Sequence, residues 1–292
     1  MLTSLAVLVR IVANPISNVF QKRLAERAAS PPFIIGSVHA CLALVCAPAL
    51  LAWKPVIGAD VWINMITAAI LAVAGNTLIV YALRSSDLSM LGPVNAYKSV
   101  VGLLLAVFLI GEYPSAVGIA GVLLIVAGSY VVVDRQVDQP GHNAFVLFFR
   151  ERGVRLRLAA LILSATEAVF LKRAVLLSSP GVVFILWSVL GVPLAAVAFL
   201  FDGTRFAAQR ETVSRFWPTY LSLTLTTGLM QLTTLLTFGR MQVGYSLALF
   251  QLSTIVSVLL GHLYFREQNI RRRFAGAVVM TIGAILIVAS ET

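Results

Sequence analysis

Apolar residues dominate ten stretches of the chain, each long enough to cross a lipid bilayer as a helix. A helix rises about 1.5 Å per residue, so roughly 20 apolar residues cover the roughly 30 Å of hydrocarbon. The pattern predicts transmembrane helices at residues 3–24, 33–53, 62–83, 88–110, 115–133, 157–178, 181–201, 216–238, 243–265 and 270–290. Because the connections are mostly short, the function must lie within the helical bundle.

Polar residues inside these stretches recur at the three- and four-residue spacing that places them on one helix face. A polar group in hydrocarbon is costly unless it faces a partner or water, so the aligned faces predict a central hydrated cavity. The residues expected to line it and to bind a substrate are Arg10, Asn14, Ser17, Asn18, Gln21, Asn76, Asn95, Lys98, Glu167, Thr227, Gln231 and Gln251. Hydroxyl groups that bond only their own helix carbonyls would explain single residues but not aligned stripes. The fifth and tenth helices carry almost no polar residues and are expected to form the outside support.

Two charged residues, Lys98 and Glu167, fall near the middle of their predicted helices. They either pair with each other and lock the bundle, or they face a substrate. In the second case Lys98, with Arg10 at a similar depth, receives a carboxylate or phosphate, and Glu167 holds an amine or a proton. Desolvation favours the neutral form of a carboxyl group, which makes Glu167 the candidate for proton coupling. Lys172 lies near a helix end, where a long side chain is expected to reach the membrane interface.

Composition places the chain in the membrane class. Of 292 residues, 59% are hydrophobic and 12% are charged, and the mean hydropathy is +0.94. The net charge of +10 would also suit a nucleic-acid partner, but Lys and Arg gather in the odd-numbered connections, as they do in cytoplasmic loops. We therefore expect no nucleic acid, a multi-pass protein of a bacterial inner (plasma) membrane, and both termini outside. The first helix lacks the basic region and cleavage site of a signal peptide and is interpreted as a retained span.

The chain offers few residues for catalysis or metal binding. Cys41 and Cys46 share one predicted helix and fit neither a zinc site nor a disulfide framework, and the intramembrane residues His39 and His262 have no ligand partners at useful spacing. An intramembrane enzyme would need a nucleophile and base, or a metal cluster, facing one cavity, and no such constellation is visible. We expect no enzyme activity, no metal and no cofactor. A membrane subunit or receptor that transports nothing is the main alternative, although it would leave the polar faces without purpose.

Two pairs of similar segments show that the chain contains an internal repeat. The segment "GEYPSAVGIAGVLLIVAG" at 111–128 matches "REQNIRRRFAGAVVMTIG" at 266–283, 155 positions later. A second segment, "VFQKR" at 19–23, returns as "VFLKR" at 169–173, 150 positions later. The small difference between the two offsets is the size of an ordinary loop-length change, so both matches belong to one repeated unit.

The repeat divides the predicted helices into two sets of five. The first unit covers residues 1–133, a linker with an interfacial "FVLFF" segment covers 134–156, and the second unit covers 157–292. Because five is odd, the second unit starts on the side of the membrane where the first unit ends. The two repeats are therefore expected to be inverted. Inverted repeats around a site near the bilayer midplane are typical of secondary transporters.

Each unit has a glutamate before its last helix, in the residue pairs "GE" and "RE". Each also has two glycines inside that helix, Gly121 and Gly128 in the first unit and Gly276 and Gly283 in the second. In these features the chain resembles the EamA-type branch of the drug/metabolite transporter superfamily. The resemblance covers nearly the whole chain and implies a ten-helix secondary transporter, in many members an exporter of amino acids, drugs or other small metabolites. Arg266 departs from the glycine of the family pattern. Interior cations outnumber interior anions, with Arg10 and Lys98 against Glu167, which favours an anion or a zwitterion over a dicationic drug. We expect a small polar or zwitterionic substrate, for example an amino acid, coupled to a proton or an exchanged counter-substrate. The paired glycines are expected to let helix backbones approach closely.

Overall fold

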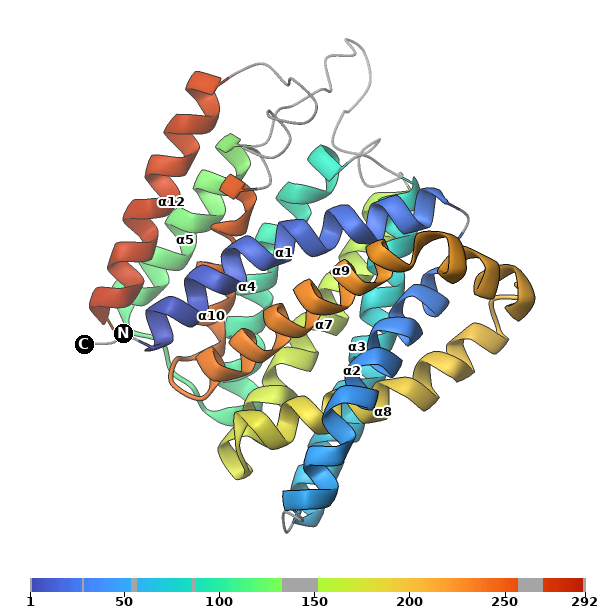
Figure 1. Cartoon of the computed structure of the whole chain (residues 1–292). Coiled ribbons are helices and arrows are strands. Elements are labelled where there is room, and N and C mark those ends of the chain that lie inside the picture. The colour runs from blue at the N-terminus through green and yellow to red at the C-terminus, as the bar shows by residue number, and fades with distance from the viewer. Residues whose placement is uncertain are drawn as a thin grey trace.

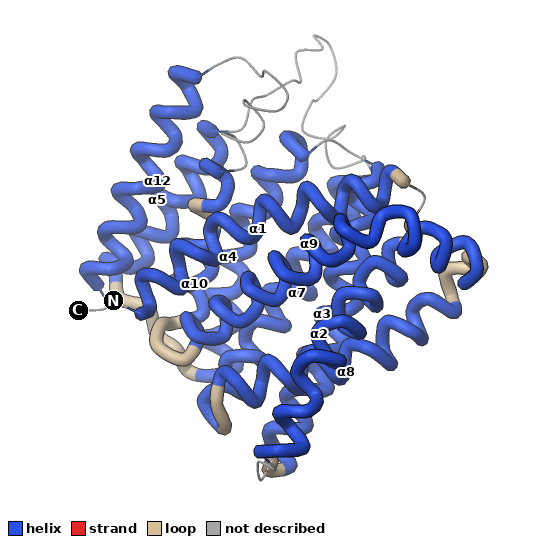
Figure 2. The backbone as a smooth tube through the Cα atoms, viewed as in Figure 1, coloured by secondary structure: helices blue, strands red, loops and turns tan. Residues whose placement is uncertain are grey.

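The computed structural model describes residues 2–27, 29–53, 57–85, 88–132, 152–256 and 270–290. Within these ranges its regular structure is entirely α-helical, which confirms the all-α prediction (Figures 1 and 2). The ten helices are α1 (Leu2–Glu26), α2 (Pro31–Trp53), α3 (Ala59–Ser85), α4 (Leu88–Ile110), α5 (Ala116–Val132), α7 (Arg152–Leu177), α8 (Pro180–Leu200), α9 (Phe206–Phe238), α10 (Val243–Phe250) and α12 (Ile270–Ser290).

Helix α9 is longer than the predicted span at 216–238. It begins at Phe206, and its first turns include the exposed residues Arg210 and Glu211. Hydropathy therefore missed this part of the helix. Phe216 leaves helical geometry, with φ −120° and ψ 26°, two residues before Pro218. A proline inside a helix removes one backbone N–H and its ring clashes with the preceding turn, so the charged and apolar parts of α9 are separated by a kink.

Two other predicted elements have different limits in the structure. Helix α7 begins at Arg152, so residues 152–156, which were assigned to the linker, are helical. The rest of the predicted linker, including its "FVLFF" segment, lies outside the described residues. Helix α10 ends at Phe250, and a turn at Gln251 precedes the helical residues 253–256, which are the last described ones in this part of the chain. The remainder of the predicted 243–265 span also lies outside the described residues.

The surface of the bundle is more apolar than parts of its interior. On α1, Leu5 and Leu8 are 58% and 61% exposed, whereas Ser17 and Gln21 of the same helix are buried. This arrangement suits a lipid solvent, because apolar side chains can face acyl chains while polar groups need internal partners. Within the described residues, four helices are long and apolar enough to cross a membrane, namely α1, α3, α8 and α9, and five shorter apolar helices accompany them.

The helices pack most extensively in four pairs: α1 with α9, α2 with α8, α3 with α7, and α5 with α12. The α5–α12 pair stands at one edge of the bundle, and the start of α1 and the end of α12 lie at the same end (Figure 1). The position of the two chain ends fits an even number of membrane crossings.

Close backbone contact between α5 and α12 occurs at the repeated glycines. A Cβ atom added to Gly121 would lie 2.7 Å from the carbonyl oxygen of Gly283, and one added to Gly128 would lie 2.8 Å from that of Gly276. The residue numbers run in opposite directions on the two helices, so the pair is antiparallel. In lipid, the hydrophobic effect does not drive helices together. Small residues instead let two helix backbones approach closely enough for van der Waals contacts to hold the pair together.

Helix α8 is positioned by a cap at its first turn and by a glycine that lets a side chain from α2 approach closely. The side chain of Ser179 caps the helix by accepting a hydrogen bond from the backbone N–H of Val182 at 3.3 Å, and Pro180 occupies a favourable first position. Further along, Gly191 makes room for the ring of His39 from α2: a Cβ atom there would lie 2.1 Å from Nδ1. The His39 ring then packs against Trp187, with the ring centroids 4.2 Å apart.

Candidate functional site

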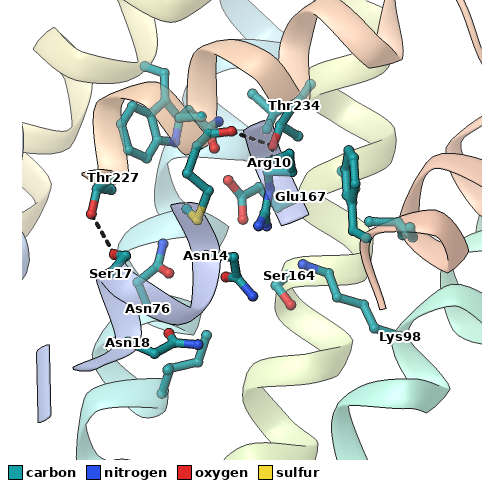
Figure 3. Close-up of a pocket in the computed structure, with 18 of the residues that line it drawn as sticks. Arg10, Asn14, Ser17, Asn18, Asn76, Lys98, Ser164, Glu167, Thr227 and Thr234 are labelled. Carbon is teal, nitrogen blue, oxygen red and sulfur yellow. Dashed lines mark hydrogen bonds between the residues drawn. The ribbon is translucent and has the colours of Figure 1, made fainter. Parts of the chain in front are cut away.

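A central cavity of about 110 Å³ lies among helices from both halves of the chain (Figure 3). This volume is several times what one water molecule needs. Residues of α1, α2, α3, α4, α7, α8, α9 and α10 line it, together with Gln251. None of the described lining residues comes from α5 or α12. Those two helices support the bundle from outside the cavity.

Eleven of the twelve predicted binding residues meet at this cavity. They are Arg10, Asn14, Ser17, Asn18, Gln21, Asn76, Lys98, Glu167, Thr227, Gln231 and Gln251. The side chain of the twelfth, Asn95, lies outside the part that the structure describes. In Figure 3 the side chains of Arg10, Asn14 and Glu167 from two different helices point into one central space, and Lys98 extends toward it from a third.

The polar face of α1 is held against α9 by two hydrogen bonds. Arg10 Nε donates to Thr234 Oγ1 at 2.8 Å, and the hydroxyls of Ser17 and Thr227 are bonded at 2.8 Å (Figure 3). The contacts are seven residues apart on each helix and run in opposite order, so α1 and α9 are antiparallel. About two helical turns separate them. The spacing seen in the sequence thus becomes a ladder of polar contacts along the cavity wall.

Two contacts fix the orientation of the Arg10 guanidinium. Thr234 accepts from Nε because its own hydroxyl proton is donated to the carbonyl of Met230 at 2.7 Å. The guanidinium also lies over the ring of Phe250, 4.9 Å from the centroid, where cation–π attraction operates. The Nη1 atom is buried and has no hydrogen-bond partner within the described residues. The far edge of the guanidinium is therefore left for a ligand or water in the cavity.

Lys98 and Glu167 share the cavity without forming an ion pair. Their charges lie within electrostatic range of each other and of Arg10. However, among the described residues, the recorded ion pair is a different one, between Lys172 and Glu112. Of the two interpretations left open by the sequence, the structure does not contain the one in which Lys98 and Glu167 lock the bundle by direct contact. Both side chains line the cavity, where the Glu167 carboxyl group also has a side-chain hydrogen bond with Trp187.

Several buried polar atoms around the cavity have no hydrogen-bond partner among the described residues. They are Arg10 Nη1, Gln21 Oε1, Gln231 Nε2 and His39 Nδ1. Buried polar groups in folded proteins are almost always satisfied by protein, water or ligand. Four such atoms on one cavity therefore indicate a space that is occupied by polar molecules.

Some lining residues were not in the predicted binding set. Arg157 of α7, at the edge of the predicted span, lines the cavity. Ser164 of α7, His39 of α2 and Trp187 of α8 also line it. A sequence signal existed for Arg157, because it lies seven residues before Ser164 and hence on the same helix face. The His39 ring stacks on Trp187 and also borders the cavity.

An ion pair joins the two halves of the chain at one end of the bundle. Lys172 Nζ lies 3.2 Å from Glu112 Oε1 and donates to the carbonyl of Met241 at 2.8 Å. Glu112 Oε2 accepts from the backbone N–H of Val243 at 2.7 Å, at the first turn of α10. The expectation that Lys172 reaches the membrane interface is wrong: its side chain is only 7% exposed. The carboxylate of Glu112, in the connection between α4 and α5 and 60 positions away in the chain, holds the ammonium inside the protein.

A second set of polar contacts lies at the ends of α3 and α8. The hydroxyl of Tyr81 donates to Asp202 Oδ1, and Thr204 Oγ1 donates to Oδ2 at 3.0 Å. Burial opposes ionisation of Asp202. These hydrogen bonds and the nearby charge of Arg84 outweigh burial and hold the pKa of the Asp202 carboxyl below its ordinary value. This cluster links the first half of the chain to the turn that follows α8.

The arrangement is suited to binding. Within the described ranges there is no group of three His, Cys, Asp or Glu residues that could hold a metal ion. Around the cavity, no hydroxyl or thiol is bonded to a histidine in the recorded hydrogen bonds of the described residues, as an activated nucleophile would require. What the cavity provides is charge, amide groups and aromatic surface arranged around a small volume.

Comparisons with known proteins agree with this fold. Residues 2–134 match the model of the EamA-like transporter family, which confirms over this part of the chain the resemblance inferred from the sequence. The chain is also similar to a solved structure described as "Crystal structure of protein", with a TM-score of 0.72, 18% identity and 98% of each chain covered. That identity is low enough that the likeness shows the fold alone. No curated protein matches the chain.

Proposed function

Since residues 2–134 are an EamA-like transporter family domain in a multi-pass membrane protein, we propose that the chain is a secondary active transporter. It exports a small polar or zwitterionic metabolite, such as an amino acid, across a bacterial inner membrane. The direction of export rests on the family resemblance. Members of this family are membrane transporters and generally not enzymes. The observation that carries the proposal is a polar cavity enclosed by helices whose contacts repeat between the two halves.

The α5–α12 contacts support a two-fold relation between the halves. The sequence repeat equates Gly121 with Gly276 and Gly128 with Gly283. The structural contacts are Gly121 with Gly283 and Gly128 with Gly276. Each contact is thus the repeat copy of the other, as in an isologous interface. Because the two helices are antiparallel, the relating axis runs across them, in the plane of the membrane.

The α1–α9 ladder supports the same relation from a different part of the bundle. By the offset of 150, Arg10 corresponds to residue 160 on α7, and by the offset of 155, Thr234 corresponds to residue 79 on α3. Helices α3 and α7 do pack closely there: a Cβ atom on Gly75 would lie 3.6 Å from the carbonyl oxygen of Ala160. Two units of five helices with inverted orientation account for both sets of contacts. Such units can expose a central site to either side of the membrane in turn.

In this mechanism the Lys172–Glu112 pair closes one end of the cavity. It joins α7 to the connection before α5 and, through Val243 and Met241, to the start of α10. Leu171, the neighbour of Lys172, lines the cavity. Opening that end requires the pair and its two backbone hydrogen bonds to break together, so the contact favours the conformation described here over its alternative.

Glu167 is the proposed site of proton coupling. It is buried, lines the cavity and lies near two cations without a direct ion pair. A protonated carboxyl group in this position can release its proton and become a carboxylate when the cavity binds substrate or opens to a different pH. Movement of substrate and proton is then linked through one group.

Flux in proteoliposomes tests the function. Purified protein is reconstituted and screened with labelled amino acids, organic acids, polyamines and quaternary amines, and transport above that of empty liposomes is expected for at least one class. Substituting Lys98→Ala together with Glu167→Gln should abolish this flux. Unchanged flux in the double variant would remove both residues from the mechanism, and no flux for any compound with folded wild-type protein would reject the transporter itself.

Coupling requires a separate measurement. Glu167→Gln should lose transport driven by a pH gradient while it retains exchange of labelled for unlabelled substrate, because exchange does not require net proton movement. Glu211→Gln is the matched control, since Glu211 is exposed on the first turns of α9. If pH-driven transport survives in Glu167→Gln, the proton is carried elsewhere.

A further inference from the structure

The cavity gathers more positive than negative charge. Arg10, Lys98 and Arg157 line it, and Glu167 is the only carboxylate among its described lining residues. Lys98 lies within electrostatic range of both arginines as well as of Glu167. Histidine is ordinarily neutral near pH 7, so His39 does not alter this balance. Like charges repel strongly where the surroundings have a low dielectric constant.

Glu167 offsets only part of this charge. The negative charge of Glu167 cancels the positive charge of one cation. Arg10 and Lys98 together therefore leave one excess positive charge, even when Arg157 is not counted. A zwitterion brings no net charge and leaves this excess in place. A cationic substrate increases it. A substrate with a net negative charge removes it, so charge balance favours an anion.

The unpartnered polar atoms point to the same chemistry. Two of them are hydrogen-bond donors: Arg10 Nη1 and Gln231 Nε2, both buried and without a partner among the described residues. The contacts of Arg10 with Thr234 and Phe250 hold its guanidinium still. A planar guanidinium edge matches the two oxygens of a carboxylate. A ligand rich in acceptor oxygens would satisfy these donors.

We propose that the transported metabolite is a small organic anion whose carboxylate binds between Arg10 and Lys98. Gln231 donates to one of its remaining oxygen atoms. This inference rests on the proposed transport function and narrows its substrate class from polar or zwitterionic metabolites to carboxylate anions. The aromatic rings of Phe250 and Trp187 leave room for an apolar part beside the acid group.

Substrates of equal shape and different charge provide the test. Two series are used with wild-type protein in proteoliposomes: lactate, alanine and alaninamide, and the phenyl-substituted versions of the same three. Within each series the compounds are an anion, a zwitterion and a cation. Each is measured by its inhibition of the flux found in the screen and by its own uptake. The anion is expected to have a half-inhibiting concentration at least about tenfold below that of the zwitterion, the effect of one hydrogen-bonded charge contact.

Variants then assign the effect to the cavity. Arg10→Gln should raise the half-inhibiting concentration of the anion about tenfold or more and change that of the zwitterion less, so that the charge preference is lost. Arg155→Gln is the matched control, because Arg155 is exposed on α7. The wild-type comparison stands without any variant, so a poorly folded Arg10→Gln protein does not prevent the test.

The outcomes separate the two proposals. Preference for the anion in wild type, lost in Arg10→Gln, supports the inference. Equal or better inhibition by the zwitterion or the cation overturns it and leaves the transport function intact. Absence of flux for every compound in the wider screen overturns both.

Discussion

The ion pair between Lys172 and Glu112 gives the sharpest test of how the two halves are held together. Replacing Lys172 with Met keeps the length and the apolar stem of the side chain but removes the charge. The substitution removes the 3.2 Å ion pair and the 2.8 Å hydrogen bond to the Met241 carbonyl. Glu112, only 14% exposed, then keeps a single recorded partner, the backbone N–H of Val243.

The cost follows from leaving one charge without its partner. Removing one member of a buried ion pair costs about 3–5 kcal/mol when no other partner remains. The remaining hydrogen bond and partial exposure of Glu112 reduce this, so we expect about 2–3 kcal/mol for Lys172→Met. For chains of 150–250 residues, 1 kcal/mol shifts the Tm by about 2–4 °C. A decrease of roughly 5–10 °C is therefore expected.

A double-mutant cycle separates the ion pair from the loss of either side chain. Thermal unfolding in detergent is followed by tryptophan fluorescence for Lys172→Met, Glu112→Gln and the two together. The double variant should be more stable than the sum of the single effects predicts, because it leaves no unpaired charge. Arg173→Met is the control: Arg173 is exposed and adjacent, and its loss should change stability by less than about 0.5 kcal/mol. Additive single effects would refute the reasoning.

Two further predictions concern helix packing and pH. Gly121→Ala should lower the Tm at a cost of about 1–3 kcal/mol, because the added Cβ would lie 2.7 Å from a carbonyl oxygen of α12. Gly58→Ala is the control and should leave the Tm unchanged, because a Cβ there has nothing within 4 Å. Equal Tm values for the two variants would contradict this packing. Asp202 has a lowered pKa in the folded protein, so its stabilising contribution is present above the ordinary aspartate pKa of about 3.9 and is lost as the pH falls through the lower folded value. Tyr81→Phe should therefore destabilise the protein more at pH 6 than at pH 3, and a difference in Tm that does not depend on pH would show that Tyr81 does not act through the charge of Asp202.

The helices and the composition of the cavity could be read from the sequence because both depend on local patterns. Hydropathy located the helices since each must cover the same thickness of hydrocarbon. The seven-residue spacing between Arg10 and Ser17 placed both on one face of α1, and the structure brings both to the cavity. Hydropathy fails to predict a helix where the helix continues into a charged segment. The charged first turns of α9 and the first residues of α7 were missed for that reason.

What the sequence determined by itself is which faces of the helices avoid lipid, because the cost of a polar group in hydrocarbon depends on that residue and its helical neighbours alone. Only the tertiary structure decided which charges meet. Lys98 and Glu167 share a cavity without an ion pair, while Lys172, assigned to the interface, is buried against Glu112. Lys172 and Glu112 are separated by 60 positions in the chain, and their contact depends on how α7 packs against the connection before α5, which no local pattern encodes.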